Sequence, residues 1–282
     1  MAAVTIQLIK QLQERTGAGI MDCKKALIEA DADIEKAIDI LREKGIAKAA
    51  SKAGRTAAEG LAVIKFDDKK AVIAEINCET DFVSGSPKFH EMVEAIADCL
   101  LAKAPKDLEG AKAATQDIFT DAVVAMRENF VFRRYELVEA AEGQAFGSYL
   151  HQGGKIAALV VLSKDAGEVN RGLAMTVASA DPYYLTLADV PAEAKARELA
   201  IAQKEVAEDP KLANKPDNVK EMIAQRKVES RLGENCLDAK AYALDPEGKL
   251  LVRELCKNKE LSIVKFVRFK VGEGVEVTPE AE

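Results

Sequence analysis

The feature that most limits the possible folds is a pattern of elements that occurs twice along the chain. Residues 61–78 are expected to form two strands joined by a polar turn, the second of which alternates in polarity, and an amphipathic helix follows Pro87. Strand, turn, strand and helix return in residues 146–180, about 85 residues later. Two-residue periodicity followed by a helical period is typical of antiparallel strands packed against a helix. The sequence therefore predicts an α+β fold, with a two-part core that contains antiparallel sheets.

The second strand of the first hairpin alternates in polarity, so its two faces can be assigned. Glu75 and Asn77 are the polar positions, and we expect them to point outward. The apolar positions are expected to point inward: Val72, Ala74, Ile76 and Cys78. Further along, a second helix is expected over roughly 115–127 and a strand near 130–138.

Helical patterns stand outside this core. Residues 4–44 contain three short segments with apolar residues at helical spacing, and Asp33 is placed to cap the third. Residues 189–232 are rich in Ala, Glu and Lys, and Pro191 and Pro216 each open a helical segment. We expect a three-helix module at the N-terminus and an antiparallel helical hairpin inserted into the second part of the core.

These patterns divide the chain into five expected parts. They are a three-helix domain (1–55), a core N-terminal subdomain (56–140), a core C-terminal subdomain (141–188 and 233–264), a helical hairpin (189–232) and a C-terminal module (265–282).

Composition excludes several classes of function. The net charge of −7 argues against a general nucleic-acid binder, which needs a basic face for phosphates, so no direct nucleic-acid contact is expected. No signal peptide and no apolar run of about 18 residues is present, so no membrane association is expected. Five scattered cysteines without C-x-x-C spacing indicate reduced thiols and a cytoplasmic location.

The sequence offers little material for catalysis. The only two histidines, His90 and His151, lie in no recognised nucleophile setting. No metal-ligand cluster and no phosphate-cradling glycine motif occurs. We therefore expect no catalytic residues, no metal and no cofactor, and we predict that the chain acts by binding another protein rather than as an enzyme.

Apolar residues in loops are the candidates for such binding. Ile20 and Met21 follow a glycine turn, and Phe82 follows Asp81 in a polar loop. Packing into the core is the default interpretation of each apolar residue, and Asp81 has an alternative role as a helix cap. Apolar groups on rigid loops are also how binding anchors are built. Both interpretations stay open at this point.

Four basic residues share one face after residue 43: Lys44, Lys48, Lys52 and Arg55. A solvated linker helix is the simpler interpretation. A basic stripe that meets an acidic partner is the alternative.

Two segments resemble the signatures of the bacterial elongation factor Ts family. Residues 12–27 read LQERTGAGIMDCKKAL and are similar to its N-terminal signature, while residues 78–83 read CETDFV and are similar to its core signature. The hairpin insertion and the Gly-Glu-Gly ending at 272–274 also match, so the resemblance covers the whole chain.

The resemblance implies a fold and a function. The fold would combine a ubiquitin-associated-like three-helix domain, a two-part α+β core and a coiled-coil hairpin. The function would be guanine-nucleotide exchange: the factor binds the GTPase elongation factor Tu and promotes GDP release by destabilising its Mg-GDP site.

The resemblance also implies which residues bind the partner. Asp81 and Phe82 would enter the GTPase beside its Mg²⁺, with Thr80 and Val83 in the same signature. The remaining implied contacts are Ile20, Met21, Lys24 and His151, and the core contact loop at Met126 and Arg127. That loop departs from the family pattern, which often has Met-Gly or Ile-Gly before Glu-Asn. Residues 240–243 read KAYA where the family usually has Gln-Pro-Phe-Val.

Two alternatives remain. The chain could be an interaction adaptor that uses its three-helix module to bind ubiquitin-like or other partners. Within the exchange-factor interpretation, the hairpin could form a homodimer or contact the GTPase.

Overall fold

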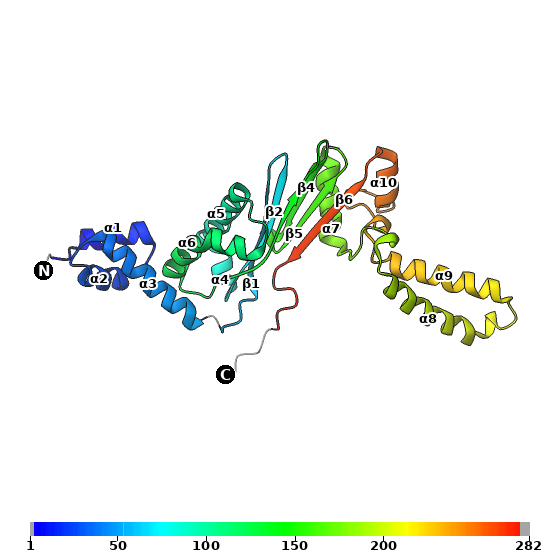
Figure 1. The fold of residues 1–282 in the computed structure, drawn as a ribbon, viewed down its shortest axis with the longest axis horizontal. Coiled ribbons are helices and arrows are strands. Elements are labelled where there is room, and N and C mark those ends of the chain that lie inside the picture. The colour runs from blue at the N-terminus through cyan, green and yellow to red at the C-terminus, as the bar shows by residue number, and fades with distance from the viewer. Residues whose placement is uncertain (1–2, 53, 277–282) are drawn as a thin grey trace. The chain divides into compact units, whose positions relative to one another are not determined.

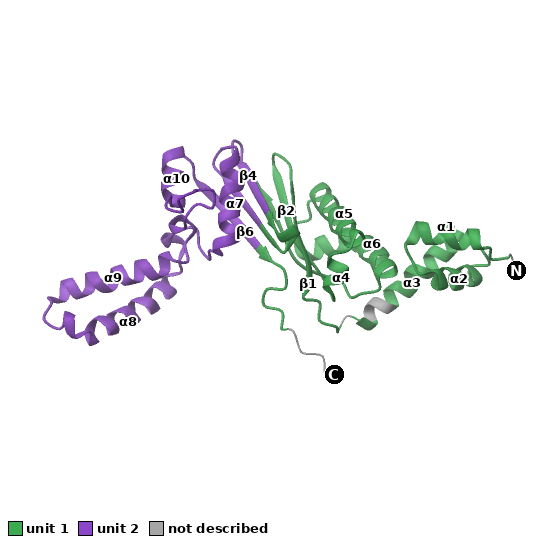
Figure 2. Ribbon diagram, turned by 180° about the vertical axis from the view of Figure 1, so that it is seen from behind, with its two compact units in different colours: residues 1–139, 150–157, 269–282 green, residues 140–149, 158–268 purple. Residues whose placement is uncertain are grey.

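The computed structural model describes residues 3–52 and 54–276, without the side chains of residues 48–50. Contacts between residues divide the chain into two units (Figure 2). The first unit comprises residues 1–139, 150–157 and 269–282, and the second comprises residues 140–149 and 158–268. The second unit is therefore inserted in the sequence of the first.

Three helices begin the first unit (Figure 1): α1 (Ile6–Thr16), α2 (Ile20–Glu29) and α3 (Ile34–Lys52). They close a small core whose buried residues are Leu12, Ala18, Cys23, Ala26, Leu27, Ala30, Ala37 and Leu41. Asp33 caps α3 as predicted, since its Oδ1 accepts a hydrogen bond of 3.1 Å from the Lys36 N–H.

The third helix is longer than the sequence pattern indicated. It continues through Gly45 to Lys52. A Cβ at Gly45 would lie only 2.6 Å from Cγ2 of Val124, so α3 packs closely on a helix distant in sequence. This tertiary packing stabilises a helical glycine that local propensity disfavours.

The first sheet is antiparallel and has the order β1-β2-β3. Its strands are β1 (Glu59–Phe66), β2 (Lys70–Cys78) and β3 (Val131–Glu139). Leu61 lies opposite Ile76 in the hairpin, and a bulge interrupts the β2–β3 register between Glu75 and Ile76.

Helices pack against this sheet: α4 (Asp81–Ser84), α5 (Pro87–Lys103) and α6 (Leu108–Met126). The apolar face predicted for α5 is buried, comprising Phe89, Met92, Val93, Ile96, Ala97 and Leu100. The expected start of the next helix near 115 is wrong. It begins at Leu108, because Asp107 caps it by accepting a hydrogen bond of 2.7 Å from the Gly110 N–H.

The predicted outward direction of Glu75 and Asn77 is also wrong, because both side chains are fully buried. Their strand, β2, lies between β1 and β3 and is buried on both faces. Glu75 is compensated by Arg133 and Arg134 of β3, whose nitrogens lie 2.9 and 2.6 Å from its carboxylate oxygens. The polar residue in this alternating strand therefore belongs to a buried cluster of charged groups and does not face solvent.

The second sheet is also antiparallel, has the order β4-β5-β6 and lies mostly in the second unit. Its strands are β4 (Ala145–His151), β5 (Ile156–Leu162) and β6 (Ile263–Lys270), with the turn η1 (Gln152–Gly154) between the first two. The other elements are the helices α7 (Glu168–Ala180) and α10 (Val252–Lys259) and the short turns η2 (Leu187–Asp189), η3 (Pro210–Leu212) and η4 (Leu237–Ala239).

The predicted helical hairpin is present as α8 (Ala192–Glu208) and α9 (Asp217–Gly233). A small apolar cluster joins the helices, formed by Ala202, Val206, Ala224 and Val228. Arg231 of α9 pairs with Glu198 and Glu205 of α8 at 3.0 and 2.7 Å. The fold is α+β, with an N-terminal helical run and two antiparallel sheets, as the sequence predicted; the five-part division stays a prediction.

None of the described helices has the length and apolar character needed to cross a lipid bilayer.

Candidate functional site

The loop after β2 is built as a helix start. Thr80 is the N-cap of α4, and its Oγ1 accepts a hydrogen bond of 3.3 Å from the Val83 N–H. Asp81 occupies the first turn, where a carboxylate is favoured by the helix dipole. The expected polar loop is therefore one turn of helix that holds Asp81 and Phe82 in fixed positions.

A carboxylate from another part of the chain clamps this loop. Glu128 Oε2 accepts hydrogen bonds from the N–H groups of Glu79 and Thr80, at 3.0 and 3.2 Å. The Thr80 hydroxyl donates to Glu128 Oε1 at 2.6 Å. In return, Glu79 Oε1 accepts a hydrogen bond of 2.6 Å from the Asn129 N–H. The two segments hold each other through reciprocal, charge-assisted bonds.

Phe82 projects from this clamped turn with 87% of its surface exposed. Asp81 and Thr80 are exposed as well. Val83 is half-buried and packs against the core of the first sheet. Phe82 was expected either to pack into the core or to serve as a binding anchor, and its exposure rules out core packing. Val83 is instead the residue that attaches the turn to the core.

The turn after His151 lies close to the end of α4. His151 is half-buried and ends β4, and the turn η1 follows it. Lys155 Nζ lies 3.5 Å from Ser84 Oγ and pairs with Glu59 at 2.6 Å. Gly154 has a φ of 105°, and a Cβ there would lie 2.8 Å from the Ala62 carbonyl oxygen. The close approach of this turn to β1 therefore requires glycine.

Helix α2 presents the other set of expected contacts. Ile20 and Met21 are 57% and 62% exposed, and Lys24 is exposed one turn later. The opposite face is buried and comprises Cys23, Ala26 and Leu27. The apolar side chains at 20 and 21 therefore lie outside the core of the three-helix module.

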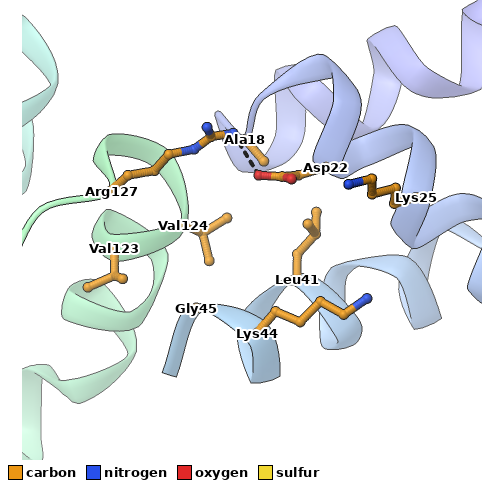
Figure 3. Close-up of a pocket in the computed structure, with 9 residues that line it drawn as sticks. All are labelled: Ala18, Asp22, Lys25, Leu41, Lys44, Gly45, Val123, Val124 and Arg127. Carbon is orange, nitrogen blue, oxygen red and sulfur yellow. Dashed lines mark hydrogen bonds and ion pairs between the residues drawn. The ribbon is translucent and has the colours of Figure 1, made fainter. Parts of the chain in front are cut away.

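Met126 and Arg127 differ from each other in environment. Met126 is half-buried against the core of the first sheet. Arg127 is exposed and caps α6 with a φ of 62°, and its Nη2 lies 2.6 Å from Oδ2 of Asp22 in α2 (Figure 3). Arg127 and Asp22 border a cavity of about 60 Å³ between α2, α3 and α6.

The basic residues after position 43 meet acidic groups of the same chain. Lys44 pairs with Glu29 of α2. Lys52 and Arg55 lie 3.9 and 2.9 Å from the carboxylate of Glu79. The side chain of Lys48 lies outside the described residues. Three members of the expected stripe thus hold segments of the first unit together.

Two titratable groups next to Asp81 have shifted pKa values. Burial raises the pKa of Glu79, but the hydrogen bonds from the Asn129 N–H and Arg55 outweigh it, so the pKa lies below its ordinary value of 4.5. Burial raises the pKa of the Cys78 thiol to about 12, and its Sγ donates to the Thr80 carbonyl oxygen. Within residues 3–52 and 54–276, no group of three or more His, Cys, Asp or Glu side chains is arranged to hold a metal ion.

The divergent segment at 240–243 has a structural role in the second unit. Tyr242 is buried and packs on Gly172, where a Cβ would lie 2.0 Å from its hydroxyl oxygen. The Ala243 N–H donates to Thr176 Oγ1 at 2.9 Å.

The structure thus brings residues 79–83, 126–129 and the turn after His151 together, and connects α2 to them through Arg127. Sequence reasoning did not identify Glu128 as the clamp of the Thr80 loop. The sequence shows an acidic residue just after the end of a helix, but no neighbouring residue indicates that it contacts a loop 48 residues away.

A comparison with protein-family models gives one further finding. The model described as elongation factor TS matches residues 79–273, which is more than half of the chain. The match begins at the clamped turn that bears Asp81 and Phe82, includes the Met126–Arg127 turn and the hairpin, and ends at Glu273.

Proposed function

The chain belongs to the elongation factor Ts family of translation elongation factors, and we propose that it binds elongation factor Tu and promotes the release of GDP from it. The observation that carries this proposal is the placement of Phe82. A large apolar side chain is 87% exposed on a turn that four hydrogen bonds to and from Glu128 and Asn129 hold in place. Preorganised, exposed aromatic groups are typical anchors of protein interfaces.

The mechanism is differential binding. The factor binds the nucleotide-free GTPase more tightly than the GDP-bound form, so its binding lowers the affinity for GDP by the same factor. Phe82 enters the partner and displaces a packed element beside the nucleotide site. Asp81 brings a carboxylate near the Mg²⁺ and phosphates, where added negative charge disturbs the coordination.

A second set of contacts comes from α2 and from the turn at His151. Ile20 and Met21 offer exposed apolar surface, and Lys24 adds a positive charge one turn later. These residues supply affinity, whereas Asp81 and Phe82 act on the nucleotide site. Thr80 caps the turn and Val83 attaches it to the core of the first sheet, while Met126 packs against the same core.

The factor requires no chemistry of its own for this role. It acts in the cytoplasm as a binding protein, not as an enzyme, and needs no cofactor, bound metal or direct contact with nucleic acid. The hairpin serves a separate contact, either with a second copy of the chain or with the GTPase.

The test follows release of fluorescent GDP from elongation factor Tu in excess unlabelled nucleotide. Wild type is expected to accelerate release, and Phe82→Ala is expected to accelerate it far less. Tyr183→Ala is the matched control, because Tyr183 is also a highly exposed aromatic residue, at 72%, but belongs to the second unit and to none of the proposed contact segments. It should behave as wild type.

Two outcomes would contradict the proposal. One is wild-type protein that leaves GDP release unchanged. The other is a well-folded Phe82→Ala protein with full exchange activity. If the chain instead captured many proteins but no GTPase, the adaptor interpretation would replace this one.

A further inference from the structure

Arg127 connects two helices that lie far apart in the sequence. It ends α6 in the left-handed region, with a φ of 62°, and this backbone reversal directs its side chain toward α2. There its Nη2 donates to Asp22 Oδ2 at 2.6 Å, across a separation of 105 residues (Figure 3). Lys52, at the end of α3, donates to the Arg127 carbonyl oxygen.

The guanidinium lies directly against the backbone where α2 begins. Gly19 is the N-cap of α2, and a Cβ at that position would lie 2.2 Å from Arg127 Nη2. A side chain at 19 would therefore displace Arg127. A positive charge is disfavoured at a helix N-terminus, and the Asp22 carboxylate in the first turn offsets it. Helix stability alone does not account for an arginine here.

The next residue holds the other contact segment. The Glu128 carboxylate accepts hydrogen bonds from the Glu79 and Thr80 N–H groups and from the Thr80 hydroxyl. Thr80 in turn caps the helix that bears Asp81 and Phe82. Two consecutive residues of one turn thus hold the beginning of α2 and the beginning of α4.

We propose that Arg127 and Glu128 form a brace that fixes the exposed face of α2 relative to the Asp81–Phe82 turn, so that both engage one partner together. This inference rests on the proposed function. Arg127 is then a positioning residue, because its guanidinium acts on Asp22 within the chain. Fixing both segments beforehand removes the ordering cost from the binding step.

The brace predicts a specific kinetic change. Asp22→Asn and Arg127→Gln should each raise the factor concentration that gives half-maximal GDP release, by about fivefold, which is the low end of coupling between sites. Asp22→Asn should keep the wild-type maximal rate, since the wedge residues are intact. The double variant should match the single variants, because both remove one interaction.

The control variant is Arg42→Gln. Arg42 forms a comparable ion pair with Asp121 of α6, at 2.9 Å, and both residues lie outside α2 and the Asp81–Phe82 turn in the sequence. It should leave the half-maximal concentration unchanged. If any ion pair between the N-terminal helices and α6 were required, Arg42→Gln would raise the half-maximal concentration as much as Asp22→Asn and Arg127→Gln do. That result would overturn the brace.

A second measurement needs no partner. Hydrogen exchange of the isolated protein should be faster in the first turn of α2 for Arg127→Gln, and at the Glu79 and Thr80 amides for Glu128→Gln. Hydrogen-exchange rates at these sites that match those of the wild-type protein would overturn the brace. So would additive effects of Asp22→Asn and Arg127→Gln on GDP release. Absence of any stimulation by wild type would refute the proposed function instead, and hydrogen exchange would still decide whether the brace exists.

Discussion

Glu75 and Arg134 form an ion pair inside the first unit: Arg134 Nε lies 2.6 Å from Glu75 Oε2, and the Glu75 side chain has no exposed surface. Arg133 Nη1 donates to the other carboxylate oxygen at 2.9 Å. The Gly272 N–H donates to the same oxygen at 2.8 Å. This carboxylate therefore joins the central strand, an edge strand and the turn after β6.

Removal of this carboxylate should destabilise the protein strongly. Glu75→Ala leaves two arginines without their buried partner, and loss of one member of a buried pair costs about 3–5 kcal/mol. Chemical denaturation measures the change. The control is Glu139→Ala, an exposed glutamate at the end of β3, which should stay within about 0.5 kcal/mol of wild type. Equal stability of the two variants would contradict the role of Glu75.

Asp81 and Phe82 should act as one unit in exchange. Phe82→Ala is expected to keep the free energy of unfolding within about 1 kcal/mol of wild type, because the ring is exposed. It should weaken the nucleotide-free complex by about 2–4 kcal/mol, the range of an interface anchor. Asp81→Ala should act in the same direction with a smaller effect.

The double variant provides the test of this coupling. Its loss of stimulated GDP release should be smaller than the sum of the single losses, since both residues address one site. Melting curves run alongside separate folding from exchange. Strictly additive losses would show that the two side chains work independently.

Cys78 should resist alkylation in the native protein. Burial raises its pKa to about 12, and the thiolate, not the thiol, is the reactive form. A pulse of iodoacetamide at about pH 8, followed by peptide mass spectrometry, should label the half-buried Cys99 well before Cys78. Unfolded protein should label both equally. Rapid native labelling of Cys78 would indicate that the β2–α4 junction opens.

The Glu79 carboxylate should make stability depend on pH in the acid range. Its pKa in the folded protein lies below 4.5, so its contribution is fully present above that value and is lost as pH falls through the folded pKa. Wild type should therefore lose stability more steeply than Glu79→Gln as the pH falls below 4.5. Parallel pH profiles for the two proteins would refute this.

The hairpin should be separable from the rest of the chain. Its helices are joined by their own apolar cluster and by the ion pairs of Arg231. Replacing residues 192–231 with a short Gly-Ser linker retains the buried Val190 and should preserve a cooperative thermal transition. A broad transition would show that the hairpin contributes to the core. Light scattering of both proteins decides whether two copies associate through it.

Local periodicity predicted correctly those elements in which burial depends on residues nearby in the sequence. The apolar face of α5 and the capping of α3 by Asp33 are examples. It failed where burial depends on distant strands. Glu75 looked like a solvent-facing residue because its partners, Arg133 and Arg134, lie 58 and 59 residues away.

The candidate site divides in the same way. Sequence pattern and resemblance pointed to Asp81, Phe82, Ile20 and Met21, and polar loops indicated that they could be exposed. The exposure of Phe82 follows from Val83 taking the core position, which the loop sequence did not specify. The contact of Arg127 with Asp22 depends on the left-handed backbone at 127 and on the bare backbone of Gly19, neither of which periodicity reveals.

The hydrogen bond from Gly272 to Glu75 spans 197 residues and has a consequence for how the protein is made. During synthesis, β1, β2 and β3 leave the ribosome long before residue 272, because the entire second unit is translated in between. Long-range contacts of this kind form late and slow the last step of folding. Nascent chains that stop before residue 269 should therefore hold an incomplete first unit, which protease digestion of stalled ribosome complexes would detect.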